Sequence, residues 1–276
     1  MVSKSQNIKS KILKLNPKLL FGVWCLLCIS SSSSFTFISS YDTKATMVEV
    51  DNFSNFYTAG GTQLFEYSPD GAFMYPYEEN KYGKIGMIDV TNPLKILVFY
   101  PDFMVAVTLD KFLSHLSTYS FLKLGYQDIT AVASSSDGLL WFYDNVEFKL
   151  KKIDENGNII LASQPLNTFL DQTPNPNFIT EKESKVYLND PDIGILVFDV
   201  FGSYAKTIPI KGLTKFQVLG DQVIYFDNHH QLSAYSQFTL DVKSVPLPDS
   251  TDIVNVAITK DRMAILKKDK VGFYKY

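Results

Sequence analysis

Short apolar stretches alternate with polar turn residues throughout residues 35–276. The run 148–166 shows the pattern, because apolar and β-branched residues flank the polar segment 154–158, which contains one glycine. Asparagine and glycine between two such stretches favour a β-hairpin. The spacing does not fit a calcium loop, since the sixth position is Ile159 instead of glycine and the twelfth is Pro165 instead of glutamate. The pattern therefore predicts a hairpin with its turn at 154–158.

The same arrangement recurs along the chain. A strand-like stretch followed by aspartate is found five times, 37 to 46 residues apart, at Asp102, Asp144, Asp190, Asp227 and Asp269. One further step toward the N-terminus reaches the turn at Gly60. Four strand-like stretches can be assigned in the third, fourth and fifth copies; the third copy begins with the stretch 129–134, and the fifth ends with the stretch 243–248. A repeat of about 40–50 residues with four strands each is typical of β-propeller blades. The sequence thus predicts six blades.

The last copy is incomplete. Residues 252–276 contain only three strand-like stretches, which would leave the outer edge of a sheet unpaired. The segment 35–42 alternates well and belongs to no other blade. We therefore expect this segment to complete the last blade as its outermost strand. The predicted fold is an all-β, six-bladed β-propeller over residues 35–276.

The first 34 residues have a different composition. Five lysines precede an uncharged run at 19–30, and four serines follow it. This order is typical of a secretory signal peptide. The apolar run is shorter than the ~20 residues that a membrane-spanning helix needs. We expect residues 1–34 to be a signal peptide with a Ser-rich tether, and the chain to be exported to the periplasm or the outer membrane. An uncleaved anchor is the alternative.

Both cysteines of the chain lie in this leader. Cys25 and Cys28 have the C-x-x-C spacing of redox motifs, but their place in an apolar run favours a role as small apolar residues. Cys28 is also a candidate lipid-attachment site, although Leu26 and Leu27 before it are larger than such cleavage usually accepts. With a lipid there, the protein would contact a membrane only through its N-terminus.

Charge and motif content argue against several function classes. The net charge is -3 and Arg262 is the single arginine, so nucleic acid is not an expected partner. The histidines are His115 and the adjacent pair His229 and His230, whose side chains would point to opposite faces of a strand. Known nucleophile and phosphate-binding motifs are missing. We expect no catalytic residue, no metal and no cofactor.

The recurring aspartates allow two interpretations. They could form a ring of carboxylates around a metal, as a propeller hydrolase or lactonase requires. They could equally cap tight turns through hydrogen bonds to backbone N–H groups, which turn chemistry alone demands at every blade. We favour capping.

Two other features are candidates for binding. In the segment 90–94, Asn-Pro forces an extended backbone, so Thr91, Asn92 and Pro93 either shape the second blade or display a binding loop. Aromatic residues also recur on the second strand of each blade, where core packing is favoured over stacking against a sugar or peptide. They are Phe99, Tyr100, Trp141, Phe142, Tyr143, Tyr187, Tyr225 and Phe226.

The segment 89–100, DVTNPLKILVFY, is the most specific motif of the chain. Together with LWFYDN and GILVFDVFGSY it resembles a family of exported bacterial six-bladed β-propeller proteins of unassigned function. A more distant resemblance is to propeller-like accessory subunits, such as the plug protein, of the type 9 secretion translocon. The resemblance implies a periplasmic protein or lipoprotein. It provides no catalytic residues to transfer.

These observations favour a non-catalytic scaffold that binds protein partners in the cell envelope and is monomeric outside its complex. An accessory role in a secretion assembly is the most specific form of this hypothesis. The alternatives are a metal-dependent hydrolase or lactonase at the mouth of the propeller channel, and a carbohydrate-binding propeller. The fold alone does not choose among them.

Overall fold

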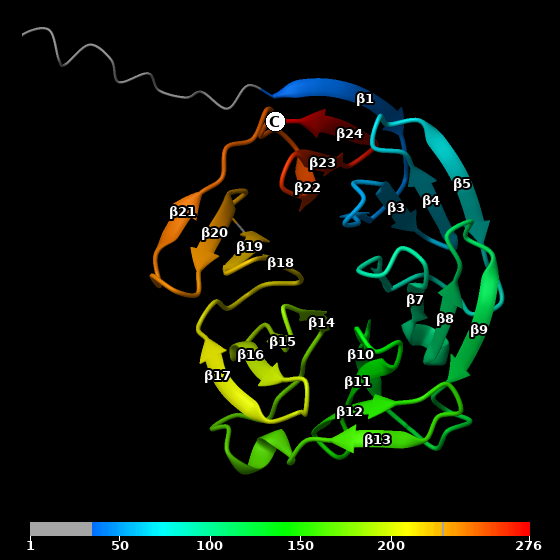
Figure 1. Cartoon of the computed structure of the whole chain (residues 1–276), viewed down its shortest axis with the longest axis vertical. Coiled ribbons are helices and arrows are strands. Elements are labelled where there is room, and N and C mark those ends of the chain that lie inside the picture. The colour runs from blue at the N-terminus through cyan, green and yellow to red at the C-terminus, as the bar shows by residue number, and fades with distance from the viewer. Residues whose placement is uncertain (1–34, 228) are drawn as a thin grey trace, which may run out of the picture. The chain divides into compact units, whose positions relative to one another are not determined.

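Six four-stranded antiparallel sheets form a ring in the computed structural model, which describes residues 35–227 and 229–276 (Figure 1). This arrangement is a six-bladed β-propeller and confirms the predicted fold class. From the innermost strand outward, blades I to III consist of β2 (Met47–Val50), β3 (Phe56–Gly60), β4 (Gln63–Tyr67) and β5 (Phe73–Glu78); β6 (Met87–Asp89), β7 (Ile96–Tyr100), β8 (Val105–Leu109) and β9 (His115–Ser120); and β10 (Ile129–Ser134), β11 (Leu140–Asp144), β12 (Lys149–Ile153) and β13 (Ile159–Ala162).

The remaining three blades follow the same order. They consist of β14 (Phe178–Lys182), β15 (Lys185–Asp190), β16 (Gly194–Asp199) and β17 (Tyr204–Ile208); β18 (Gln217–Leu219), β19 (Gln222–Phe226), β20 (Leu232–Ser236) and β21 (Val242–Ser244); and β22 (Ile253–Ile258), β23 (Arg262–Lys267), β24 (Lys270–Lys275) and β1 (Thr36–Asp42). Two single-turn 3-10 helices, η2 (Pro101–Phe103) and η3 (Leu166–Thr168), lie in connections. Within the described ranges, no helix has the length and apolar character needed to cross a membrane.

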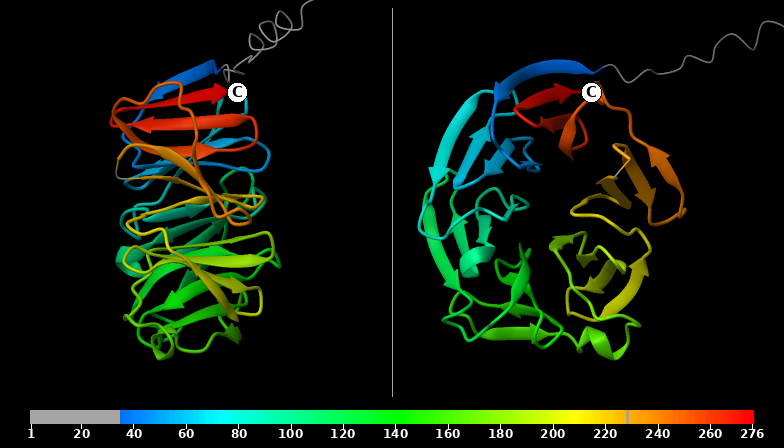
Figure 2. Two further views of the ribbon diagram at one scale, coloured as in Figure 1. Left: turned by 90° about the vertical axis from the view of Figure 1, so that its left-hand side faces the viewer. Right: turned by 180° about the vertical axis from the view of Figure 1, so that it is seen from behind.

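The N-terminal strand closes the ring, as predicted. β1 pairs antiparallel with β24, with Thr36 opposite Lys275 and Asp42 opposite Lys270, and it forms the outer strand of blade VI (Figures 1 and 2). The Phe37 ring also lies edge-on to Tyr274, with ring centroids 5.7 Å apart. The last blade therefore has four strands like the others, and β24 is not left as an exposed edge.

The core lies between the blades. Successive side chains of a strand point to opposite faces of its sheet. In blade I, Phe56 therefore stacks on Phe273 of blade VI at 4.3 Å, while Tyr57 joins a cluster with Ile88 and Val98 of blade II. The predicted core role is confirmed for six of the second-strand aromatic residues, which are at most 2% exposed; they are Phe99, Tyr100, Trp141, Phe142, Tyr143 and Tyr187. Tyr225 and Phe226 are half-buried.

The segment 154–158 is a hairpin turn between β12 and β13, as predicted. The Asp154 carboxylate accepts hydrogen bonds from the N–H groups of Asn156 and Asn158 at 2.9 and 2.8 Å. Gly157 has φ +83°, a conformation that glycine adopts without steric cost. The same aspartate cap, with bonds to the second and fourth residues after it, recurs in other turns; the aspartates are Asp51, Asp110, Asp199 and Asp227.

Several predicted strand ends differ from the structure, most of all in blade V. The sequence pattern predicts an outer strand of blade V over 243–248, whereas β21 ends at Ser244. Pro246 and Pro248 follow, and proline has no N–H group to donate to a neighbouring strand. The predicted signal peptide and tether, including the candidate lipidation site Cys28, lie outside the described residues.

Candidate functional site

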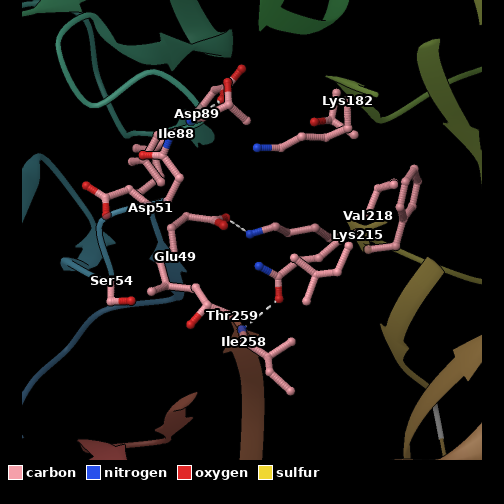
Figure 3. A pocket seen from close by; sticks show the side chains of 18 of the residues that line it. Glu49, Asp51, Ser54, Ile88, Asp89, Lys182, Lys215, Val218, Ile258 and Thr259 are labelled. Atoms are coloured by element: carbon pink, nitrogen blue, oxygen red, sulfur yellow. Dashed lines mark hydrogen bonds and ion pairs between the residues drawn. The ribbon is translucent and has the colours of Figure 1, made fainter. Parts of the chain in front are cut away.

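A cavity of about 300 Å³ lies at the centre of the ring, among the inner strands of blades I, II, IV, V and VI (Figure 3). Charged side chains reach it because the ends of the innermost strands and their following turns converge there. Glu49, Asp51 and Asp89 come from blades I and II, and Lys182 and Lys215 come from blades IV and V. The cavity thus has a carboxylate side and an ammonium side. None of these five residues was predicted to be a site residue.

An ion pair crosses the cavity. The Lys215 ammonium of blade V contacts the Glu49 carboxylate of blade I, and Glu49 is only 8% exposed (Figure 3). Removal from water lowers the pKa of Lys215 to about 7, and the neighbouring carboxylate acts in the opposite direction. The pair links two blades that are not neighbours in the ring.

Asp51 is engaged in its own turn. Its Oδ1 accepts hydrogen bonds from the N–H groups of Phe53 and Asn55, at 2.8 and 2.9 Å. Its Oδ2 accepts from the Asn55 amide at 2.9 Å and from the Tyr57 hydroxyl at 3.1 Å. Four donors therefore hold this carboxylate, which is 2% exposed, so its role in the turn leaves little acceptor capacity for a ligand.

Inner-strand side chains also join neighbouring blades. Asp89 Oδ1 accepts from the Thr91 N–H at 2.9 Å, and its Oδ2 accepts from the Ser134 N–H of blade III at 2.8 Å. Gln217 Oε1 does the same between blades V and VI by accepting from the Ile258 N–H at 2.8 Å. Among the described residues Asp89 accepts only these two hydrogen bonds, so its carboxylate retains unused acceptor sites.

Glu181 forms a denser junction between blades III and IV. Its carboxylate accepts hydrogen bonds from the Ser135 hydroxyl at 2.6 Å, from the N–H and hydroxyl of Ser136 at 3.0 and 2.5 Å, and from the Trp141 indole at 2.6 Å. Burial acts to raise the pKa of Glu181, but these bonds together outweigh it and hold the pKa below its ordinary value. The carboxylate is therefore ionised and structural.

A groove of about 470 Å³ adjoins the central cavity where the inner-strand turns of blades I to IV meet. The two share Asn52, Thr91 and Lys182, so the groove is the mouth of the cavity; we call it the mouth groove. Phe53 and Leu94 line it and are 62% and 63% exposed. Two large apolar side chains in water at one groove are typical of an interaction site.

The predicted binding loop lies in the mouth groove. Thr91, Asn92 and Pro93 all line it, and Thr91 also lines the cavity. The Asn92 side chain accepts a hydrogen bond from the Leu94 N–H at 3.0 Å, and the Lys95 ammonium donates to a backbone carbonyl of blade III at 2.9 Å. The loop is thus fixed in shape, and its role in binding stays a prediction.

Three of the recurring aspartates cap turns. Asp144 accepts from two backbone N–H groups at 2.9 and 3.2 Å and also pairs with Lys151 at 2.7 Å. Asp190 and Asp227 accept from the backbone in the same way. Asp102 and Asp269 make no such bond to the described part of the chain. Among the described residues, no group of three or more His, Cys, Asp or Glu side chains is placed to hold a metal.

The histidines lie away from the cavity and the mouth groove, neither of which is lined by one. His115 is exposed on β9 and bonds with the Thr118 hydroxyl at 2.8 Å. His229 and His230 lie in the turn between β19 and β20 and are also exposed. The three histidines are therefore too scattered to form one site.

The comparison with known proteins supports the fold alone. No family model and no curated protein matches the sequence. Similar solved structures include a streptogramin B lyase, with TM-score 0.59, 12% identity and coverage of 88% of this chain and 97% of that one. BamB from Moraxella catarrhalis has TM-score 0.54, 11% identity and coverage of 88% and 98%. The Pan2 WD40 domain of Neurospora crassa has TM-score 0.56, 10% identity and coverage of 84% and 79%.

Proposed function

We propose that the protein is an exported, non-catalytic scaffold of the periplasm or outer membrane, which holds a protein partner at the mouth groove. The exposure of Phe53 and Leu94 at this groove carries the proposal. Apolar side chains set in a polar rim supply the desolvated anchor points on which protein interfaces depend.

The surroundings of the two residues support this use. Thr91 and Asn92 add polar groups, and Pro93 and the Lys95 clamp stiffen the loop that carries Leu94. Phe53 is at the tip of the Asp51 turn, which four hydrogen bonds fix. A preformed surface loses little conformational entropy on binding, which favours affinity.

The proposed compartment rests on the sequence. The basic, apolar and serine-rich order of residues 1–34 supports export, and lipidation at Cys28 would tether the propeller to a membrane through its N-terminus alone. The resemblance to exported propeller proteins supports the same compartment. In its most specific form, the proposal is an accessory subunit of a secretion assembly, monomeric outside it and with no need of a cofactor.

Site-specific cross-linking tests the proposal. A photo-cross-linking residue at Asn92 should capture one discrete envelope protein in living cells. The double variant Phe53→Ser, Leu94→Ser should lose this product. Phe238→Ser is the matched control, because Phe238 is 87% exposed but lies outside the groove, and it should keep the product. Equal capture by all three proteins would contradict binding at the mouth groove.

A catalytic role is the second candidate, and the fold similarity to lyases favours testing it. One neighbour is a virginiamycin B lyase from Staphylococcus aureus in a catalytically inactive histidine-to-alanine form with quinupristin, at 12% identity. That lyase thus depends on a histidine, whereas the histidines described here lie outside the cavity. Cleavage of quinupristin, or of a lactone or ester in a metal-dependent manner, would replace the scaffold proposal. Binding of oligosaccharides at the groove would favour the carbohydrate-binding alternative.

A further inference from the structure

Lys182 differs from Lys215, the other half-buried lysine of the central cavity, because it has no partner among the described residues. It ends β14, is half-buried and projects its ammonium into the cavity (Figure 3). Among the described residues it has no ion pair and no hydrogen bond, whereas Lys215 beside it is paired with Glu49. An ammonium that faces the cavity without a partner in the protein can pair with the anionic group of a ligand. The cavity therefore offers three unused donors at one place.

The opposite wall offers the complementary charge. Asp89 is 8% exposed, and its two backbone hydrogen bonds leave acceptor sites free. Asp51 and Glu49 contribute less, because Asp51 is held by four donors and Glu49 by Lys215. The pairing within the protein thus leaves Lys182 and Asp89 available on facing sides of the cavity. Lys260 and Asp261 also line it, but both are exposed, and Asp261 is paired with Arg262.

We infer that the central cavity binds a small zwitterion of the α-amino acid class, with its carboxylate on Lys182 and its ammonium on Asp89. Thr91 also lines the cavity and adds a polar residue to its wall. A simple anion would satisfy Lys182 alone, and a simple cation would satisfy Asp89 alone. Only a ligand with both charges uses the whole polarity of the site.

Size and lining support a small ligand. The cavity of about 300 Å³ lies at the lower end of the range for ligand sites, so it suits a single small molecule and not a polymer. Ile88, Phe178 and Val218 provide apolar wall on which a short side chain would pack. The site is separate from the apolar pair Phe53 and Leu94, which do not line the cavity. Because the cavity and the mouth groove share Asn52, Thr91 and Lys182, the groove is one route by which a ligand can reach the cavity.

Calorimetric titration of the purified exported chain tests the inference. Glycine, L-alanine and L-leucine are the probes, with sodium acetate and methylammonium chloride as single-charge controls. We expect saturable binding of at least one amino acid, at least tenfold tighter than either control. Lys182→Met should weaken this binding tenfold or more. Lys185→Met is the matched variant, because Lys185 is exposed across the same turn and should bind like the wild type.

Three results would each contradict the inference: no amino acid binds, acetate binds as tightly as the amino acids, or Lys182→Met binds the amino acid as tightly as the wild type does. Asp89→Asn is a second variant for the same titration and should also weaken binding of the amino acid. Because Asp89 accepts a hydrogen bond from Ser134, an unchanged melting temperature must first show that blades II and III still pack together. The cross-linking test uses Asn92, Phe53 and Leu94, none of which lines the cavity. Failure of one experiment therefore does not decide the other.

Discussion

Two buried glutamates of this propeller differ in their hydrogen-bond donors and in the direction in which their pKa is shifted. Glu66 on β4 of blade I is 3% exposed, and Glu181 on β14 of blade IV is 7% exposed. Four donors surround the Glu181 carboxylate, and its pKa lies below the ordinary value. Glu66 accepts one hydrogen bond, from Tyr57 at 3.1 Å, and its Oε2 has no partner. Burial raises the pKa of Glu66 to about 7; the Tyr57 bond opposes this and the Asp51 charge adds to it.

The difference teaches that the number of donors, and not depth, decides whether a buried carboxylate is ionised. Glu181 is the second-last residue of an inner strand and lies beside a turn of the neighbouring blade, where N–H and hydroxyl groups are free to donate. Glu66 lies within a sheet whose N–H groups already serve strand pairing, with Tyr57 directly opposite it. The Tyr57 hydroxyl has one hydrogen for two carboxylates, those of Glu66 and Asp51.

Removal of the Glu181 carboxylate should have the largest effect. Glu181→Ala leaves the Ser135, Ser136 and Trp141 donors without acceptors between blades III and IV. We expect the free energy of unfolding to fall by about 3 kcal/mol or more. Urea denaturation at pH 7 measures it. Glu183→Ala is the control, because Glu183 is exposed in the same turn and should cost less than ~0.5 kcal/mol. Equal effects would refute the comparison.

Removing the carboxylate of Glu66 should have the opposite effect, because Glu66→Gln should increase the free energy of unfolding at high pH. A folded-state pKa of about 7 exceeds the ordinary value of 4.5, so the stabilisation from the protonated form is complete at low pH and is lost as the pH rises through 7. The wild type should lose up to about 3 kcal/mol of stability between pH 5 and 8 through this group. Glu66→Gln should lack that loss and be the more stable protein at pH 8.

Urea denaturation of both proteins at pH 5, 6, 7 and 8 provides the measurement. Glu78→Gln is the control, since Glu78 is an exposed glutamate of the same blade. An unchanged pH profile in Glu66→Gln would show that Glu66 is ionised in the folded protein, and the contrast with Glu181 would disappear.

Asp144 is intermediate between Glu66 and Glu181, because the buried Lys151 and two backbone N–H groups stabilise its carboxylate. Asp144→Asn should keep the turn cap but lose the charge that pairs with Lys151 at 2.7 Å. Glu147 still contacts Lys151 at 2.8 Å, so we expect a loss of only about 1–2 kcal/mol. In a double-mutant cycle with Lys151→Met the coupling should account for most of this loss. Additive effects would show that the pair is not coupled.

Asp154 should show the smallest effect, because its carboxylate is held by turn donors at the surface. Asp154→Asn keeps an acceptor oxygen, so the melting temperature should stay within error of the wild type. Asp154→Ala removes the cap and should lower the melting temperature slightly. A larger drop for asparagine than for alanine would mean that charge, and not capping, is what this position provides.

The ring could be predicted because its signals are local. Strand periodicity, turn residues and the repeat spacing gave all six blades, and β10 matches the predicted strand 129–134. Closure by residues 35–42 followed from counting strands. The end of β21 was predicted at residue 248 instead of Ser244, although Pro246 and Pro248, which have no N–H group to donate, favour an earlier end.

The cavity could not be predicted in the same way. Glu49 and Lys215 meet because blades I and V, which blade VI separates in the ring, both extend side chains into the central cavity, and no local pattern brings residues so distant in sequence together. The Thr91–Pro93 loop was found from its Asn-Pro step, which is a local signal. Phe53 had a usable signal too, since 51–55 has the same turn chemistry as 154–158 and places the middle residue at the tip.

The pairing of β1 with β24 also determines the order in which parts of the propeller can fold. Thr36 is synthesised early, whereas its partner Lys275 is synthesised more than 200 residues later. Contacts between residues far apart in the sequence form slowly, because closing the long loop between them costs entropy. We therefore expect the pairing of β1 with β24 to be the last and slowest step of folding. Until then, β1 and β24 are both open edges that a chaperone could hold or another chain could capture. A circular permutant that joins Tyr276 to Phe35 would turn this pair into a local hairpin and should fold faster.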